Sequence, residues 1–292
     1  MDDFSIFVNR LIQMTMKKII TLLLLILATT VTLAQKKEKI KGSKIVTTER
    51  REIDNFQELV IEDNLEVQLE RGEKAEIKIE ADENLHEVIS LEQYNKTLRI
   101  YTTQLASSYK KMIVRVTYTD DLNLIISKNE SSVNAIQELL LDKITLNAYD
   151  SSKLFINAKT QNFALQAGDK SKTELNLKSE NATIELNKNA SMKALIVTDV
   201  LKVDQYQKSS ATVEGNATSA AIRLDNNASF TGNKLNTKSA TITTESYTKC
   251  SLFVEKEVII DAINKSEIQL LGTPKIEMRK FLDEAKLIKK LK

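Results

Sequence analysis

The fold is decided by residues 169–209, which read DKSKTELNLKSENATIELNKNASMKALIVTDVLKVDQYQKS. Ser171, Ala190 and Ser209 stand at the same point of successive copies, which sets a period of about 19 residues. On either side of a short polar turn, apolar and polar residues alternate, which is the pattern of half-buried β-strands. A strand-built period of about 20 residues is typical of a solenoid, in which each coil buries its inner face against its neighbours.

A small residue recurs at this point nine times, and the first interval, from Ser131 to Ser152, is the longest. These anchor residues are Ser131, Ser152, Ser171, Ala190, Ser209, Ala228, Thr248, Ser266 and Ala285. Two positions before the anchor, six of the nine residues are Asn or Asp, which tolerate the left-handed backbone of tight turns. We therefore expect an all-β fold: a single-stranded, right-handed parallel β-helix of about nine coils over residues 120–292. Residues 274–292 are expected to form a terminal cap coil rather than a basic amphipathic helix.

The register predicts which side chains face inward. Coils stack about 4.8 Å apart, so equivalent residues form ladders, and the inward ladders must be apolar. Cys250 lies two positions after an anchor, on an inward ladder, and is predicted to be a buried apolar side chain rather than a reactive thiol. Leu224 and Ile260 are likewise expected inside, and Lys178 outside. Because Cys250 is the only cysteine, an intrachain disulfide and a cysteine metal cluster are excluded.

Before the repeat lie a polar lead, residues 35–44, and a β-rich N-terminal block, residues 45–119. Residues 65–69 and 113–118 alternate apolar and polar side chains, as strands do. In this block, residues 82–89 are the stretch for which a helical turn is considered.

The N-terminus has the features of a secretory signal peptide over residues 16–34. Met16, Lys17 and Lys18 form a basic start, an apolar run follows, and residues 32–34 are suited to signal peptidase. Residues 1–15 precede this start and are interpreted as a start-site overcall. An exported protein is expected, located in the periplasm, at the cell surface or secreted, without a stable membrane span after cleavage. An uncleaved anchor is the alternative, although the apolar run is short for a span.

Charge and composition argue against several function classes. The 42 Lys and Arg residues nearly balance the 40 Asp and Glu residues and are not grouped, so no nucleic-acid partner is expected. The only histidine, His86, lies in a charged segment and is interpreted as an ordinary surface residue. No phosphate loop, paired-histidine motif or dinucleotide fingerprint is present, so no cofactor and no catalytic site are predicted.

The strongest candidate for a metal site is a ladder of turn residues. Asn129, Asp150 and Asp169 would stack on successive coils and offer the oxygen ligands that suit Ca²⁺. The same residues also serve simply to shape turns, and Lys170 and Lys188 beside them oppose a cation. The turn-forming role is favoured, and no metal is predicted.

The order of several diffuse motifs resembles the head GIN domain family of auto-transporter adhesins from bacterial envelopes. The motifs are residues 56–61 leading into 65–72, then 81–85, 98–100 and 272–276. The chain departs from the family in having only six glycines, and in Asp120-Asp121 where a proline is usual. The resemblance implies export, stacked β units and adhesion or surface recognition, with no established reaction.

Three functions remain open. The favoured one is a non-enzymatic cell-envelope protein whose rigid β-solenoid surface serves adhesion, scaffolding or envelope assembly, with protein or glycan partners. Extended sheet faces suit broad multivalent contacts rather than a deep pocket. The alternatives are a polysaccharide-binding or polysaccharide-cleaving β-helix, and a periplasmic sensing module with its specificity in the N-terminal block.

Overall fold

The computed structural model describes residues 37–290. The predictions for residues 1–15 and 16–34 lie outside this range. The chain divides into Met1–Lys39 and a compact unit, Ile40–Lys292, and the description below concerns the compact unit. Among the described residues no helix is long and apolar enough to cross a membrane.

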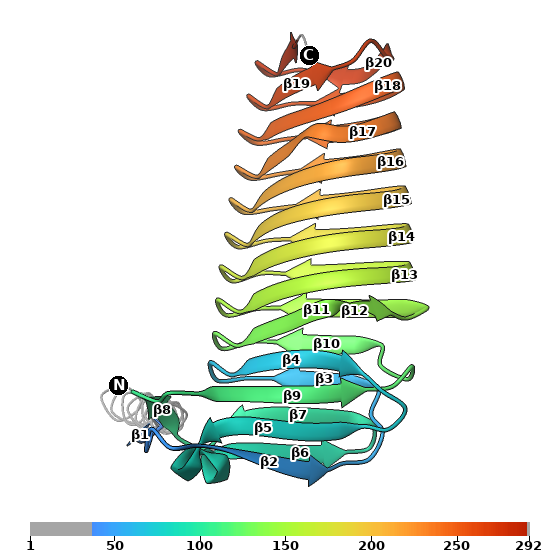
Figure 1. Cartoon of the computed structure of the whole chain (residues 1–292). Coiled ribbons are helices and arrows are strands. Elements are labelled where there is room, and N and C mark those ends of the chain that lie inside the picture. Colours follow the sequence, from blue (N-terminus) through green and yellow to red (C-terminus); the bar gives the residue numbers. More distant parts are fainter. Residues whose placement is uncertain (1–36, 291–292) are drawn as a thin grey trace, which may run out of the picture. The chain divides into compact units, whose positions relative to one another are not determined.

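Nineteen strands within residues 37–290 form one hydrogen-bonded sheet that coils on itself, so that two faces of stacked strands lie opposite each other (Figure 1). We call these two faces sheet A and sheet B. Each coil contains one tight two-residue turn, described below. Sheet A contains the strands that follow these turns, and sheet B contains the strands that precede them. The strands that belong to one sheet or that flank the stack are β2 (Val46–Glu52), β3 (Glu58–Ile61), β4 (Glu66–Arg71), β5 (Glu76–Asp82), β6 (Ile89–Tyr94), β7 (Thr97–Thr102), β9 (Met112–Tyr118), β10 (Leu124–Ser127), β11 (Ser132–Leu140), β12 (Lys143–Ala148), β19 (Glu267–Leu271), β20 (Lys275–Phe281) and β21 (Lys286–Lys289). β1 (Lys39–Lys41) and β8 (Leu105–Ser107) form a separate two-stranded sheet.

Six long strands run through both sheets and form the middle of the stack. They are β13 (Lys153–Ala167), β14 (Lys172–Leu186), β15 (Ser191–Gln205), β16 (Ser210–Leu224), β17 (Ser229–Thr244) and β18 (Lys249–Ala262). Each begins in sheet A, bends at a corner and ends in sheet B. Neighbours pair in parallel, with Leu154 beside Thr173 and Ala167 beside Leu186, so the offset between β13 and β14 is the same at both ends and equals the repeat period. The predicted β-solenoid of about nine coils is confirmed.

The tight turns that join sheet B to sheet A all have the same backbone conformation. Two consecutive residues have positive φ in ten successive turns, as in a type I′ turn. The pairs are Asp63-Asn64, Asn129-Glu130, Asp150-Ser151, Asp169-Lys170, Lys188-Asn189, Gln207-Lys208, Asn226-Asn227, Ser246-Tyr247, Asn264-Lys265 and Asp283-Glu284. In each pair but the last, the second residue donates its N–H to the carbonyl of the next turn, as Glu130 does to Asp150 at 2.9 Å. The turns therefore form their own hydrogen-bonded ladder.

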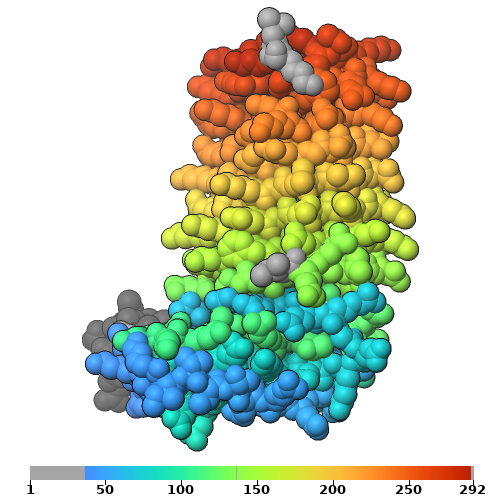
Figure 2. All heavy atoms as spheres, in the orientation of Figure 1, coloured from blue at the N-terminus to red at the C-terminus, as the bar shows by residue number. Residues whose placement is uncertain are grey.

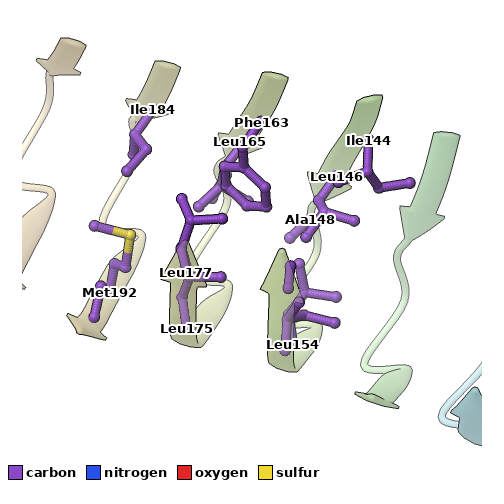
Figure 3. Packing of buried hydrophobic residues seen from close by; sticks show 14 of the residues in the cluster. Ile144, Leu146, Ala148, Leu154, Phe163, Leu165, Leu175, Leu177, Ile184 and Met192 are labelled. Carbon is purple, nitrogen blue, oxygen red and sulfur yellow. The ribbon is translucent and has the colours of Figure 1, made fainter. Parts of the chain in front are cut away.

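The core lies between the sheets, where apolar side chains from the two sides meet. Figure 3 shows Ile144, Leu146 and Phe163 of sheet B opposite Leu154 and Leu175 of sheet A. The anchors from residue 131 to residue 266 are buried at the end of each turn, as the register predicts. Burying one Leu or Ile side chain between the sheets stabilises the fold by about 2 kcal/mol, so many contributions of similar size stabilise the stack.

Departures from the repeat period are β-bulges. Between Ala135 and Leu139, β11 has two more residues than β13 has between Ile156 and Ala158, which accounts for the long first interval of the repeat. At this bulge β11 and β12 extend beyond the neighbouring coils (Figure 1). At the C-terminal end, β20 and β21 form the last coil. Residues 275–289 are thus strands and a turn, as predicted, and not a helix.

The stack begins inside the N-terminal block. β3 and β4 pair in parallel with β10 and β11, in register with the later coils, and Asn64 donates to the Asn129 carbonyl at 2.8 Å. β7 and β9 pair in parallel with the other edges of β3 and β4. Antiparallel strands then end the sheets: β5 and β2 on sheet A, and β6 on sheet B. The first coil of the solenoid, formed by β3 and β4, therefore comes earlier in the chain than β5–β9, which complete the block.

Candidate functional site

A concave surface lies along the corner where the long strands bend from sheet A to sheet B. It is a groove of about 1150 Å³, which we call the corner groove. It crosses seven successive levels of the stack, from Leu140 through Val197 to Glu255, a length of about 30 Å at 4.8 Å per coil. Figure 2 shows how side chains of successive coils lie in level rows.

The groove exists because the strands turn this corner without a loop. In the coils from residue 140 to residue 238, three consecutive residues make the corner; the middle one is buried, or half-buried at Ser179, and its neighbours are exposed. The middle residues that form the groove floor are Leu141, Thr160, Ser179, Thr198 and Ala217. The flanking side chains diverge around the bend and form two walls. The corner groove therefore runs parallel to the axis of the stack.

The floor hydroxyls are held within the protein. Thr160 Oγ1 donates to the Asp142 carbonyl at 2.8 Å, and Thr198 Oγ1 donates to the Glu180 carbonyl at 3.0 Å. Ser179 Oγ lies 3.1 Å from Thr198 Oγ1. These bonds fix the bend, so the groups that remain available to a ligand are on the walls.

The two walls differ in charge. Lys143 and Lys238 line the groove on the sheet B side. Lys159 and Lys178, adjacent in register, stand on the sheet A side, and the carboxylates of Asp142, Glu180 and Asp199 stand on the sheet B side. Like charges side by side across a sheet cost stability. Within the described part of the chain, no ion pair closer than 4.0 Å involves the five side chains Asp142, Lys159, Lys178, Glu180 and Asp199.

Charged pairs are formed on the same stack outside the groove. Lys188 pairs with Asp169 at 3.3 Å, and Lys202 pairs with Asp204 at 3.1 Å. The contrast leaves the groove with donors and acceptors that have no ionic partner. Asp199 Oδ1 accepts a hydrogen bond from Thr218 Oγ1 at 3.3 Å. The other four groups are available to bind hydroxyl or amide groups of a ligand.

Apolar side chains add to the groove in its middle and at its start. Leu140 and Val197 are 41% and 44% exposed, so both present apolar surface to solvent. At the start, Arg71 pairs with Asp120 at 2.6 Å and closes the groove against the N-terminal block. A second, shallower groove of about 520 Å³ lies on sheet A around Phe155 and Leu195.

The predicted turn ladder has the geometry of turns. Asn129, Asp150 and Asp169 all have φ between 50° and 55°, in the first left-handed position. Asp169 is bound by Lys188, whose charge takes the place that a cation would need. Among residues 37–290 no group of three His, Cys, Asp or Glu side chains is arranged to hold a metal ion.

The interpretation of His86 as a surface residue is wrong. η2 (Glu83–Val88), the predicted helical turn, packs His86 against β2, where the side chain is buried. Its Nε2 lies 2.9 Å from Thr47 Oγ1 and its Nδ1 3.2 Å from Glu49. The spacing resembles a hydrolytic triad, but Arg51 binds the same Glu49 carboxylate at 2.8 Å and donates to the His86 carbonyl. The cluster fastens β2 to η2.

Cys250 lies in the core, as predicted, with 1% of its surface exposed. Burial raises the pKa of its thiol to about 12, because the thiolate would lose its hydration. The side chain is therefore unreactive at neutral pH.

Sequence reasoning did not find the corner groove. Its residues come from seven coils, and no turn signal marks the bend, since residues 159–161 read Lys-Thr-Gln. Taken along the chain, the outer charges indicate only a mixed, solvated surface. The available signal was the register itself, which places Lys159 beside Lys178 and puts Glu180 two residues after Lys178, across the corner.

Comparison with known proteins supports the fold. Crystal structures described as "putative adhesin" from Parabacteroides merdae and Parabacteroides distasonis superpose with TM-scores of 0.66 and 0.58, at 14% and 15% identity. They cover 87% and 86% of this chain, and 99% of each of theirs. A P. distasonis structure described as a "putative lipid binding protein" has a TM-score of 0.58 at 14% identity, over 87% of this chain and all of that one. No curated protein matches the sequence. The family model described as "Putative auto-transporter adhesin, head GIN domain" matches residues 55–274, and the chain belongs to that family.

Proposed function

We propose that this chain is an exported, non-enzymatic cell-envelope protein that holds one extended polymer chain of a surface partner in the corner groove. Membership of an adhesin family supports export and adhesion. The stack serves as a rigid support, because each coil is hydrogen-bonded along its length to the next.

The observation that carries the proposal is the size of the groove. A volume of about 1150 Å³ over about 30 Å gives a cross-section of about 40 Å². A single extended strand occupies about 4.8 by 10 Å in a packed sheet, an area of the same order. One extended chain fits the groove, whereas a folded domain does not enter it.

Multivalent contact compensates for weak contacts at each level. The wall positions recur on successive coils, so a polymer meets a new pair of side chains at each level, such as Lys178 with Glu180 and then Asn216 with Thr218. Linked weak contacts raise overall binding far above that of one contact. Adhesion to a polymer-coated surface requires this kind of binding.

The test is retention of beads coated with the protein, purified after expression of the full sequence, on immobilised mucin, collagen and bacterial envelope polysaccharide. Asn216→Arg places a long side chain in the groove wall, and Thr231→Arg makes the same change in size and charge on sheet A outside it. We expect retention on at least one coating, lost with Asn216→Arg and kept with Thr231→Arg. Absence of retention on every coating, or equal losses for both variants, contradicts the proposal.

A further inference from the structure

We infer that the polymer held in the corner groove is a neutral polysaccharide, read by side-chain hydrogen bonds from the two walls. This inference rests on the proposed function and names the chemical class of its ligand.

The backbone at the corner argues against a peptide. Extended peptides bind sheets mainly by adding main-chain hydrogen bonds at an open strand edge. Here the strands pair through the bend, with Lys159 beside Lys178 and Thr160 beside Ser179. The Gln161 N–H donates to the Asp142 carbonyl at 3.0 Å. The groove crosses the strands instead of following an edge, so a peptide would leave its own main-chain groups without backbone partners.

The charge of the lining argues against a charged polymer. The five cationic residues are Arg71, Lys143, Lys159, Lys178 and Lys238. The six anionic residues are Asp120, Asp121, Asp142, Glu180, Asp199 and Glu255. The sum is 5 − 6 = −1, spread over about 30 Å, so neither a polyanion nor a polycation is favoured.

Sugar hydroxyls satisfy both walls, because each hydroxyl both donates and accepts. Lys159 and Lys178 carry ammonium donors, and Glu180 and Asp199 carry carboxylate acceptors. Hydrogen bonds to charged groups are stronger than neutral ones, which suits a ligand without charge of its own. The exposed Val197 side chain offers an apolar contact to the C–H groups of a sugar ring.

The regular spacing of the walls also suits a polysaccharide. Wall positions recur about every 4.8 Å along the stack, so a polymer that lies in the groove meets new wall side chains at each level. No aromatic side chain lines the groove, so each sugar contributes little and affinity has to accumulate with chain length.

The experiment is calorimetric titration with neutral linear β-glucan and N-acetylglucosamine oligosaccharides of two to eight sugars. We expect affinity for at least one series to rise with length until the groove is filled. Glu180→Ala and Lys178→Ala each lower it about tenfold, the loss of one charge-assisted hydrogen bond. The matched control is Lys172→Ala, an exposed lysine of sheet A outside the groove, which changes it less than about twofold. Raising NaCl from about 0.05 to about 0.5 M has a similarly small effect, since a neutral ligand releases few counterions.

Other outcomes contradict the inference and separate it from the proposed function. Failure of every neutral oligosaccharide to bind, or tighter binding of heparin, alginate or an extended peptide, overturns the neutral-polysaccharide assignment. If Asn216→Arg still abolishes bead retention in that case, the groove keeps its adhesive role. If Asn216→Arg leaves retention unchanged, both proposals fail. Shortened oligosaccharide products that disappear with Glu180→Ala overturn the non-enzymatic function instead.

Discussion

The N-terminal block and the repeat stack use the same two sheets but are stabilised differently. In the stack, interior ladders are mainly apolar, and most charged side chains project from the outer faces. The block buries charged and polar groups: Asp82 is fully buried, and Glu62 and His86 are nearly so. Glu62 is held by Arg99 at 3.0 Å and by Lys128 of the first repeat coil at 3.1 Å.

The difference follows from what each region has to do. A coil in the middle of the stack meets two similar neighbours, so the same side chains work at every level. An end has a sheet edge that has to be stopped, because open strand edges invite further pairing. The block achieves this with antiparallel strands β2, β5 and β6, and these strands need specific polar contacts to hold them.

The largest expected effect is on the repeat interior. Leu224→Asp or Ile260→Asp places an unpaired charge in a fully buried position and should cost about 4 kcal/mol in the free energy of unfolding. Lys178→Asp, on the outside of the same stack, should change it by less than about 0.5 kcal/mol. Urea unfolding followed by circular dichroism measures all three. Similar losses for all three variants would disprove the inward register.

A smaller effect is expected in the block, where Asp82 accepts hydrogen bonds from the backbone N–H groups of Lys44, Lys110 and Lys111 at 2.8–3.1 Å. Asp82→Asn weakens this set and should cost about 2 kcal/mol at pH 7. Burial by itself would raise the pKa of Asp82, but the three N–H donors outweigh it and the pKa lies below its usual value.

The sign of this shift sets the pH dependence. A carboxyl whose pKa is lower in the folded state stabilises the fold fully above its unfolded pKa of about 4, and this contribution is lost as pH falls through the folded pKa. The stability difference between the native protein and Asp82→Asn should therefore shrink below about pH 4. A difference that stays constant from pH 7 to pH 3 would contradict the role assigned to Asp82.

The smallest expected effect is a difference in unfolding free energy between substitutions at two anchor residues. Ser131, at the junction with the block, has its Oγ 2.7 Å from Ser127 Oγ and donates to the Ile61 carbonyl at 3.2 Å. Ser171, inside the stack, buries an Oγ that has no partner among the described residues. Ser131→Ala should cost about 1 kcal/mol, while Ser171→Ala should leave stability unchanged or raise it slightly. Thermal unfolding of the pair distinguishes them, and an equal cost for both would remove the contrast.

The repeat could be predicted because its information is local. The position of Cys250 in the core, the turn role of Asp150 and the terminal coil all follow from counting along the repeat period. The long first interval, from Ser131 to Ser152, even marks the bulge of β11, although its meaning requires the pairing with β13.

The rest depends on contacts between distant residues. The pairing of β3 with β10 spans an insertion, and nothing in either strand specifies its partner. His86 is misplaced by sequence reasoning because its charged neighbours suggest exposure, whereas the packing of η2 on β2 decides its burial. The corner groove arises from a bend inside continuous strands, so it has no sequence signal of its own.

The most direct test of the account is deletion of one coil, residues 191–209, which joins Ala190 to Ser210 and keeps the register of both sheets. The matched control removes the same number of residues from the block, residues 76–94, which carry β5, η2 and β6. We predict that the first variant keeps a β-type circular dichroism spectrum and a cooperative unfolding transition, while the second loses both. Loss of the fold on removing residues 191–209, or survival of the fold without residues 76–94, would contradict a stack of equivalent coils closed by a specific end.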